Sequence, residues 1–284
     1  MQLSLVISIA ETSFEAVAMR GDWRASIRTA GALGFDGVEL AVRDPGHVDV
    51  AAVVRAAHDA GVAIAAIGTG QAFLQEGLTL TSEDPQIRQR AIERIEHQLV
   101  FAAAFGAPVI IGLMCGRLGG GRPATDERLV GSLEQLLPPA ERVGVRLLVE
   151  PINRYETDYL TTMDQVLSVI DRVNSPALGV VADTFHMNIE ETSIEHALRC
   201  GASRLGHVHV ADSNRHAPGW GHLDFASILA VLKEVGYRGY LSAEILPHPE
   251  PTGAAAQTLQ YLRQLVGQHW DPSALNVKSK ERKP

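Results

Sequence analysis

Short apolar runs alternate with helix-like segments along almost the whole chain, and this alternation constrains the fold more than any other feature. Eight runs rich in valine, isoleucine, leucine and alanine recur about every 25 to 40 residues, and each precedes a stretch with helical spacing of its apolar residues. That spacing is the size of one strand–helix unit of a parallel sheet. Because composition does not change between the units, the sequence predicts an α/β protein with a single (β/α)8 TIM barrel rather than two domains.

The expected elements can be placed by residue number. The apolar runs predict strands at 3–9, 37–41, 62–67, 108–113, 146–149, 179–182, 206–208 and 240–243. Helices are expected at about 22–33, 47–60, from 84, at 125–143, after the capping boxes Thr162/Gln165 and Thr192/Glu195, from Asp224 to Gly236, and at 253–266. The barrel domain is therefore expected to span residues 1–269. Residues 270–284 lack an apolar period and are expected to form a flexible C-terminal tail.

Composition narrows the class of protein. The net charge of −8 disfavours a nucleic-acid surface, because binding phosphates requires a basic stripe. The apolar N-terminal stretch has no basic region before it and is too short to span a bilayer, so neither a signal peptide nor a membrane partner is expected. The two cysteines, Cys115 and Cys200, lie in unrelated contexts and are expected to be reduced thiols. These features predict a cytoplasmic protein.

Four of the predicted strands end on a side chain that can bind a metal ion. These side chains are Glu150, Asp183, His209 and Glu244. A lone carboxylate after a strand is often a helix N-cap, and a lone histidine is often a core residue. Four such residues at corresponding positions favour a shared site, because parallel barrel strands direct their C-terminal ends to one face.

The chemistry of this set indicates the metal. Three carboxylates and one imidazole form an oxygen-rich site that suits Mn²⁺ best and tolerates Mg²⁺, Co²⁺ or Zn²⁺. His207 lies two residues before His209, on the same strand face, and is expected to be a hydrogen-bonded core histidine rather than a ligand. Further polar residues follow the strand ends, a density that suits a polyol with many hydroxyl groups.

Several longer motifs carry a resemblance to a known family. The segments LVEPINRYE, VADTFHMNIEE, HVHVADSNRHAPGWGHLDF and SAEI resemble the sugar isomerase and epimerase family with the xylose-isomerase-like barrel, over residues 1 to about 267. The block DTFHMNIEE is similar to that of the ketose 3-epimerases that act on D-tagatose and D-allulose. The segments VELAVRDP, AIGTGQAFL and EPINRYETD also resemble the 5-keto-L-gluconate epimerases, which interconvert that sugar acid and D-tagaturonate.

The resemblance implies roles for individual residues. It makes Glu150, Asp183, His209 and Glu244 the ligands of one divalent metal ion, with Glu150 and Glu244 also the two acid/base groups. The implied substrate contacts are Glu156, His186 and Arg215. The segment ILPHPE after Glu244 departs from the MEPF-type ending of some ketose epimerases, which affects substrate preference.

Epimerising a carbon next to a ketone requires a proton to leave one face and another to arrive on the opposite face, so two bases are needed. The resulting hypothesis is a metal-dependent epimerase that works through an enediolate, with 5-keto-L-gluconate and D-tagaturonate as its sugars. A sugar acid also needs a partner for its carboxylate, and Arg43 and Gln71 are candidates. Arg43 is equally well explained as a rim salt bridge.

Other functions remain open at this stage. A ketohexose 3-epimerase or an aldose–ketose isomerase of the hydroxypyruvate type would use the same enediolate chemistry. From other classes, an AP endonuclease-like repair enzyme would want further histidines and a basic groove, and a non-catalytic sugar binder would not need two bases. The expected partner is a small keto-sugar or keto-sugar acid, and the family resemblance suggests a homo-oligomer, either a dimer or a tetramer.

Overall fold

Eight parallel strands pair in chain order and close on themselves, because β8 pairs with β1. The structure is a computed structural model and describes residues 1–267; the tail predicted at 270–284 lies outside the described residues. The strands are β1 (Gln2–Ser8), β2 (Gly37–Ala41), β3 (Ala63–Gly68), β4 (Val109–Ile111), β5 (Leu147–Val149), β6 (Leu178–Asp183), β7 (Leu205–Val210) and β8 (Tyr240–Ala243). The predicted (β/α)8 barrel is confirmed.

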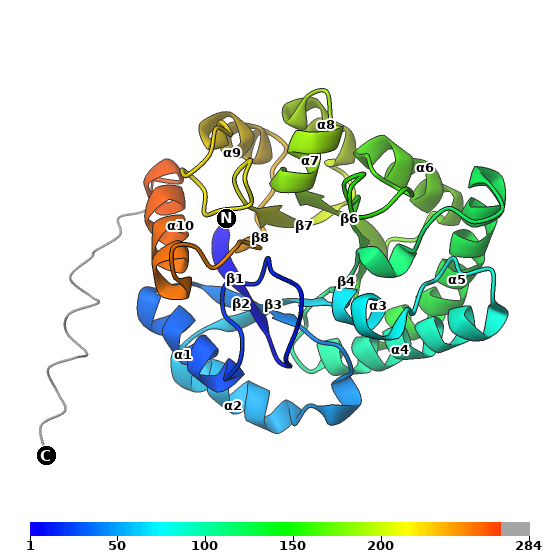
Figure 1. Cartoon of the computed structure of the whole chain (residues 1–284), viewed down its shortest axis with the longest axis horizontal. Coiled ribbons are helices and arrows are strands. Elements are labelled where there is room, and N and C mark those ends of the chain that lie inside the picture. The colour runs from blue at the N-terminus through cyan, green and yellow to red at the C-terminus, as the bar shows by residue number, and fades with distance from the viewer. Residues whose placement is uncertain (268–284) are drawn as a thin grey trace, which may run out of the picture.

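Helices surround the strands as an outer layer, as Figure 1 shows. They are α1 (Trp23–Leu33), α2 (Val50–Ala60), α3 (Gly70–Glu76), α4 (Pro85–Ala103), α5 (Arg122–Val143), α6 (Met163–Val173), α7 (Thr184–Glu190), α8 (Ile194–Gly201), α9 (Phe225–Glu234) and α10 (Pro251–Leu265), with 3-10 turns η1 (Pro45–His47) and η2 (Leu113–Cys115). Among the described residues, no helix is both long enough and apolar enough to cross a membrane.

Four of the eight predicted helix starts are confirmed by their caps. The side chains of Asp22, Asp84, Thr162 and Asp224 each accept a backbone N–H of the first turn. The capping box predicted at Thr192 and Glu195 is wrong, because α8 is capped by the next residue, Ser193, whose hydroxyl accepts the N–H of His196. Three other helix starts also differ: α2 begins after the η1 turn rather than at residue 47, α5 begins three residues before 125, and α10 begins two residues before 253.

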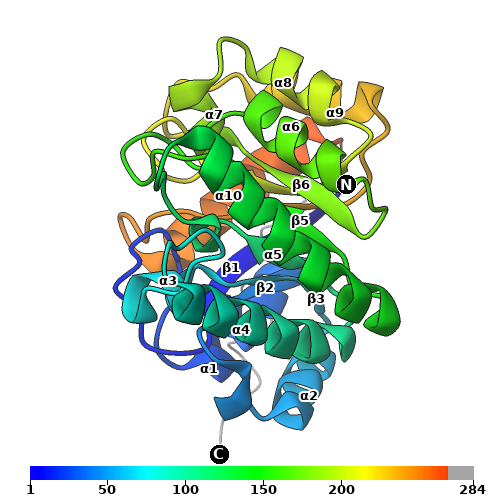
Figure 2. The same ribbon diagram turned by 90° about the vertical axis from the view of Figure 1, so that its right-hand side faces the viewer.

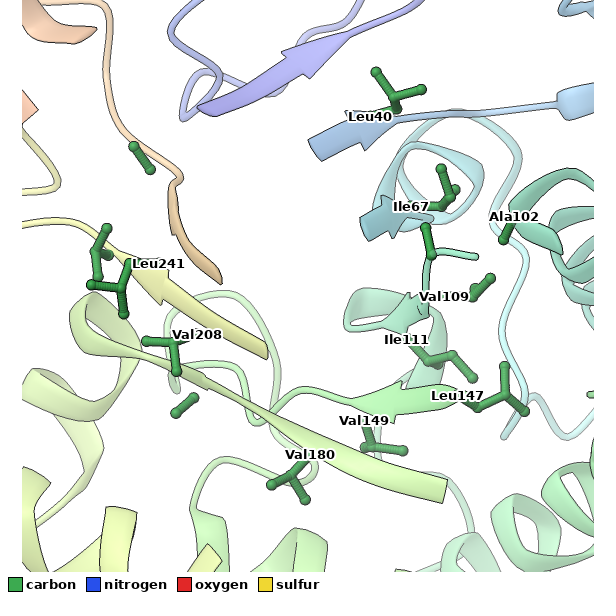
Figure 3. Close-up of a cluster of buried hydrophobic side chains, with 14 of the residues drawn as sticks. Leu40, Ile67, Ala102, Val109, Ile111, Leu147, Val149, Val180, Val208 and Leu241 are labelled. Carbon is green, nitrogen blue, oxygen red and sulfur yellow. The ribbon is translucent and has the colours of Figure 1, made fainter. Parts of the chain in front are cut away.

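The main apolar core lies between the strands and the helices. Figure 3 shows outward-facing side chains of β2 to β8, such as Leu40, Val149 and Leu241, together with Ala102 of α4. All of these side chains are fully buried. Burial of this kind contributes about 25 cal/mol per Å² of apolar surface, so the layer between strands and helices holds the barrel together.

Alternate residues of the same strands point into the barrel. Ala66, Ile110, Leu148 and Val181 form a separate apolar cluster there. Because side chains alternate between the two faces of a strand, positions two residues further along β5 and β6 also face inward. These positions are Glu150 and Asp183, and the same alternation places polar groups at the C-terminal mouth of the barrel.

Two short helices that the sequence did not predict follow strands at this mouth. Helix α3 comes directly after β3, and α7 starts at the residue after β6. Figure 2 places both on the same side of the barrel, away from the N-terminus. They therefore form part of the rim around the candidate site.

Candidate active site

The four predicted ligands come from four consecutive strands of the barrel. They lie at the C-terminal ends of β5, β6, β7 and β8, in the order Glu150, Asp183, His209 and Glu244. Three of them, Glu150, His209 and Glu244, line one cavity with an empty volume of about 580 Å³. The barrel therefore brings together residues that are separated by nearly a hundred positions in the sequence.

Asp183 connects the members of this group. Its Oδ2 lies 3.8 Å from Nδ1 of His209 and 3.7 Å from Nε2 of His186. Nδ1 of His209 is in turn 2.8 Å from Oε1 of Glu150. Candidate ligand atoms of Glu150, Asp183 and His209 lie within 4.8 Å of one another, and so do those of Asp183, His186 and Glu244. These two clusters share Asp183 and together contain the four predicted ligands and His186.

One carboxylate oxygen of the group has no hydrogen-bond partner. Oδ1 of Asp183 accepts the backbone N–H groups of Phe185 at 2.7 Å and His186 at 3.4 Å, whereas the buried Oδ2 accepts none. Leaving such an oxygen unpaired costs about 1–3 kcal/mol, and more when it is charged. A divalent cation would satisfy it, and the carboxylate and imidazole donors around it are those that such a cation prefers. The residues present therefore fit a hard divalent metal ion.

Arg215 crosses the mouth of the site between two carboxylates. Its guanidinium donates to Glu156 at 2.7 Å and to Glu244 at 2.9 Å, and its Cζ lies 5.1 and 4.7 Å from the ring centroids of Phe14 and Phe185. The φ of Arg215 is +60°, in a region that non-glycine residues seldom adopt and that is enriched at functional sites. Burial lowers the pKa of Arg215, but Glu244 and Glu156 outweigh it and raise that pKa above its usual value. Arg215 therefore stays charged.

Burial also changes the ionisation of the acidic groups. It raises the pKa of Glu244 to about 8, although His209 and Arg215 act in the opposite direction, and the nearby carboxylates of Glu150 and Asp183 add to the rise. Burial acts in the same direction on Asp183, but neighbouring histidines and Arg215 outweigh it, so the pKa of Asp183 lies below its usual value. Two carboxyl groups of one site thus differ in their affinity for a proton.

A fifth acidic residue, Glu39, belongs to the same network and was not predicted. Its side chain is buried in the middle of β2, and Oε2 lies 2.9 Å from Nε2 of His207 and 3.0 Å from Nε2 of His209. Burial raises the pKa of Glu39, but the two histidines outweigh it and the net shift is downward. His207 is therefore the buried, hydrogen-bonded histidine that the sequence predicted.

Glu39 also determines how His209 is held. With Nε2 facing Glu39 and Nδ1 facing Glu150, both ring nitrogens of His209 have a carboxylate partner. Burial lowers the pKa of His209, but Glu39 and Glu150 raise it well above the usual value. An imidazole anchored through one nitrogen presents the other in a fixed direction. The contact with Glu39 therefore directs Nδ1 toward the ligand group.

Two of the predicted substrate contacts share one anchor. Asn153 donates its amide to Oε1 of Glu156 at 2.9 Å and lies 2.7 Å from Nδ1 of His186. Glu156 and His186 both line the cavity, as does Arg215. Asn153 is buried in the segment after β5, so it holds these two side chains at the cavity wall.

The two remaining candidates, Gln71 and Arg43, lie in different places. Gln71 is 3% exposed and lines the cavity. Arg43 does not line it: the guanidinium lies 2.6 Å from Oε1 of Gln75 and 3.8 Å from Oε1 of Glu76. Arg43 instead borders a neighbouring hollow that is also lined by residues 10–13 and Gln75. The structure thus brings eight of the nine predicted site residues to one place and leaves Arg43 on the rim beside it.

Comparisons with known proteins identify the family of this barrel. Residues 27–265 match the family described as xylose isomerase-like TIM barrel. The L-ribulose 3-epimerase of Methylomonas sp. (strain DH-1) is 32% identical over 239 residues, which cover 81% of this chain and 82% of that protein. The 3-dehydro-D-guloside 4-epimerase of Escherichia coli (strain K12) is 34% identical over 140 residues, covering 49% of this chain and 53% of that protein.

A solved structure is also similar over most of the chain. The D-allulose 3-epimerase from Methylomonas sp. in complex with D-allulose matches with a TM-score of 0.78 and 26% sequence identity. The match covers 93% of this chain and 97% of that one. All three of these proteins are named as sugar epimerases.

Proposed function

The protein belongs to the xylose isomerase-like TIM barrel family, and we propose that it is a metal-dependent isomerase that epimerises the carbon next to the ketone of a keto-sugar or keto-sugar acid. The observation that carries the proposal is the pair Glu150 and Glu244. These carboxylates follow β5 and β8, line one cavity and belong to two candidate metal-binding clusters that share Asp183. The names of the related proteins support the same reaction class.

In this proposal Glu150, Asp183, His209 and Glu244 hold one divalent cation, with Mn²⁺ the first choice and Mg²⁺, Co²⁺ or Zn²⁺ as alternatives. The unpaired Oδ2 of Asp183 supports this assignment. When bound, the cation would polarise the ketone and offset the negative charge of the enediolate.

The protein's own side chains move the protons. One carboxylate of the Glu150 and Glu244 pair takes the proton from the carbon beside the ketone, leaving the electron pair in the enediolate. The other carboxyl returns a proton to the opposite face of that carbon, and the roles exchange in the reverse reaction. Arg215, Glu156 and His186 bind substrate hydroxyls and hold the open-chain sugar with the carbon beside its ketone between the two bases.

For the substrate we propose 5-keto-L-gluconate and D-tagaturonate. The support is the resemblance of segments 38–45 and 66–74 to the 5-keto-L-gluconate epimerases. These segments contain the C-terminal ends of β2 and β3 and the rim residues that follow them. A neutral ketohexose is the second candidate, because a specific observation favours it. Arg215 is the one lysine or arginine among the described residues lining the cavity, and it is already paired with two carboxylates. Arg43 could meet a substrate carboxylate only from the adjacent rim.

Solvent-deuterium exchange tests the reaction. Wild-type protein with Mn²⁺ should incorporate deuterium at the carbon beside the ketone of D-tagaturonate or D-tagatose and release the epimer. Glu150→Gln and Glu244→Gln should each lose about 10²- to 10⁴-fold in rate. Glu127→Gln, an exposed carboxylate on α5, serves as the matched control and should keep full activity. Near wild-type epimerisation by either of the first two variants would exclude the two-base scheme.

The same assay separates the alternatives. An aldose product would indicate an aldose–ketose isomerase, and binding without any exchange would indicate a sugar binder. Comparing kcat/KM of Arg43→Ala on D-tagaturonate and D-tagatose tests the carboxylate role, since equal losses on both would exclude it. The proposal also includes a cytoplasmic location, supported by the two free cysteines, and a dimer or tetramer, supported by the family resemblance.

A further inference from the structure

The hydrogen bonds of Gln71 can be assigned without ambiguity. Its Nε2 lies 2.7 Å from Oγ of Ser8, the last residue of β1, and that hydroxyl lies 2.5 Å from the backbone oxygen of Ala10. A carbonyl oxygen can only accept, so the single hydroxyl proton of Ser8 goes to Ala10. The Ser8 oxygen must therefore accept from Gln71. Reversing the Gln71 amide would place two acceptors against each other.

This assignment leaves the other end of the amide free. Oε1 of Gln71 is buried and has no hydrogen-bond partner. An unsatisfied buried carbonyl oxygen costs about 1–3 kcal/mol. Because Gln71 lines the cavity, a ligand in that cavity can remove this cost.

Gln98 shows why the cavity matters to the argument. It is also buried, donates its amide to the backbone oxygen of Val42 at 2.8 Å, and leaves its own Oε1 unpaired. Gln98 does not line the cavity, so its unpaired oxygen identifies no binding site. Gln71 differs in combining an unpaired acceptor with a place in the cavity wall.

From these contacts we infer that Oε1 of Gln71 accepts a hydrogen bond from one substrate hydroxyl and so selects sugars that carry that hydroxyl. The inference rests on the proposed function. An ionised carboxylate cannot serve, because it has no proton to donate and would face a second acceptor. Gln71 therefore binds a hydroxyl group even when the substrate is a sugar acid, and the carboxylate of that substrate must lie elsewhere.

The topology indicates which part of the substrate Gln71 meets. The four predicted ligands follow β5 to β8, whereas Gln71 follows β3 and its anchor Ser8 ends β1. In a closed eight-stranded barrel β3 lies across from β7, which carries His209, whereas β1 pairs with β8 and only anchors Gln71 through Ser8. The contact is therefore with a hydroxyl remote from the epimerised carbon. This contact selects among substrates, because a substrate that lacks the hydroxyl leaves the oxygen unpaired.

The test compares D-tagatose with its 4-, 5- and 6-deoxy derivatives in wild-type protein and in Gln71→Met, with Mn²⁺ present. With wild-type protein, one deoxy derivative should have a kcat/KM roughly 10-fold below that of D-tagatose. With Gln71→Met, the same derivative and D-tagatose should have equal kcat/KM values. For each of the other derivatives, the loss in kcat/KM relative to D-tagatose should be the same in the two proteins. Equal penalties for all three derivatives in both proteins would overturn the inference.

Controls keep this outcome distinct from failure of the proposed function. Gln98→Met should give the wild-type pattern, since Gln98 is a buried glutamine outside the cavity. If Gln71→Met does not fold, Gln71→Asn takes its place in the test. This variant keeps the amide but shortens the side chain by one methylene, which moves the oxygen away from the substrate. Calorimetric binding of the same sugars is measured in parallel. Absence of deuterium exchange would refute the proposed reaction, while the binding pattern would still confirm or refute the role of Gln71.

Discussion

Glu39 shows how a single charge is kept inside the barrel. A lone buried carboxylate would be unstable in its ionised form, but Glu39 has two histidines within hydrogen-bond distance, and these shift its pKa downward against the effect of burial. Removing one member of a buried charged group is costly, because the groups left behind lose their partner in a medium of low polarity. The stability of this network therefore depends on Glu39.

Replacing Glu39 by alanine should lower the free energy of unfolding by about 3–5 kcal/mol, because His207 loses its carboxylate partner and His209 loses one of its two. Urea unfolding in the presence of a chelator measures the change without a contribution from metal binding. The control is Glu127→Ala on the surface of α5, which should change stability by about 0.5 kcal/mol or less. A loss below about 1 kcal/mol for Glu39→Ala would contradict this description.

At the same scale, the sequence was informative for residues at strand ends and less so for residues within strands. Glu150, Asp183, His209 and Glu244 each stand at the end of an apolar run, and this position marked them as candidates. Glu39 lies between Val38 and Leu40, both fully buried, and was hidden by them. Alternation could have revealed it, since flanking residues that face the helices place Glu39 on the inner face of β2.

Among the elements, α8 depends on a cap that the sequence placed one residue early. The hydroxyl of Ser193 accepts the backbone N–H of His196 at 3.2 Å. Ser193→Ala should therefore lower the free energy of unfolding by about 1 kcal/mol, whereas Thr192→Ala should have little effect. Thermal and urea unfolding of the two variants measure the difference. The reverse order would mean that Thr192 caps the helix.

The accuracy of element prediction followed the strength of each local signal. Long helices such as α4 have a repeating apolar face and an aspartate cap, and strands such as β2 are short apolar runs between turn residues, so both were found. The seven-residue helices α3 and α7 have neither a long repeat nor a loop before them. Asp183, the residue before α7, is both the N-cap of this helix and one of the predicted ligands. Their position depends on the barrel and could not be read from local sequence.

For the whole molecule, barrel closure and metal binding should reinforce each other. The four predicted ligands come from β5, β6, β7 and β8, so one bound cation would connect half of the strands of the barrel. A ligand that binds only the folded state stabilises it by mass action, by about 2.7 kcal/mol at 100 times its Kd. The unfolded chain cannot hold these scattered residues together, so the full effect should appear in the folding equilibrium.

Adding Mn²⁺ to chelator-treated protein, at about 100 times its Kd, should therefore raise the melting temperature by about 5–10 °C, since 1 kcal/mol corresponds to about 2–4 °C in domains of 150–250 residues. Differential scanning calorimetry measures the shift. Asp183→Asn should fold and lose most of it, because Asp183 belongs to two of the three candidate ligand clusters and has the unpaired oxygen. Glu127→Gln should keep the full shift. An equal shift in Asp183→Asn and wild-type protein would place the metal elsewhere, and no shift in wild-type protein would argue against a metal site in the barrel.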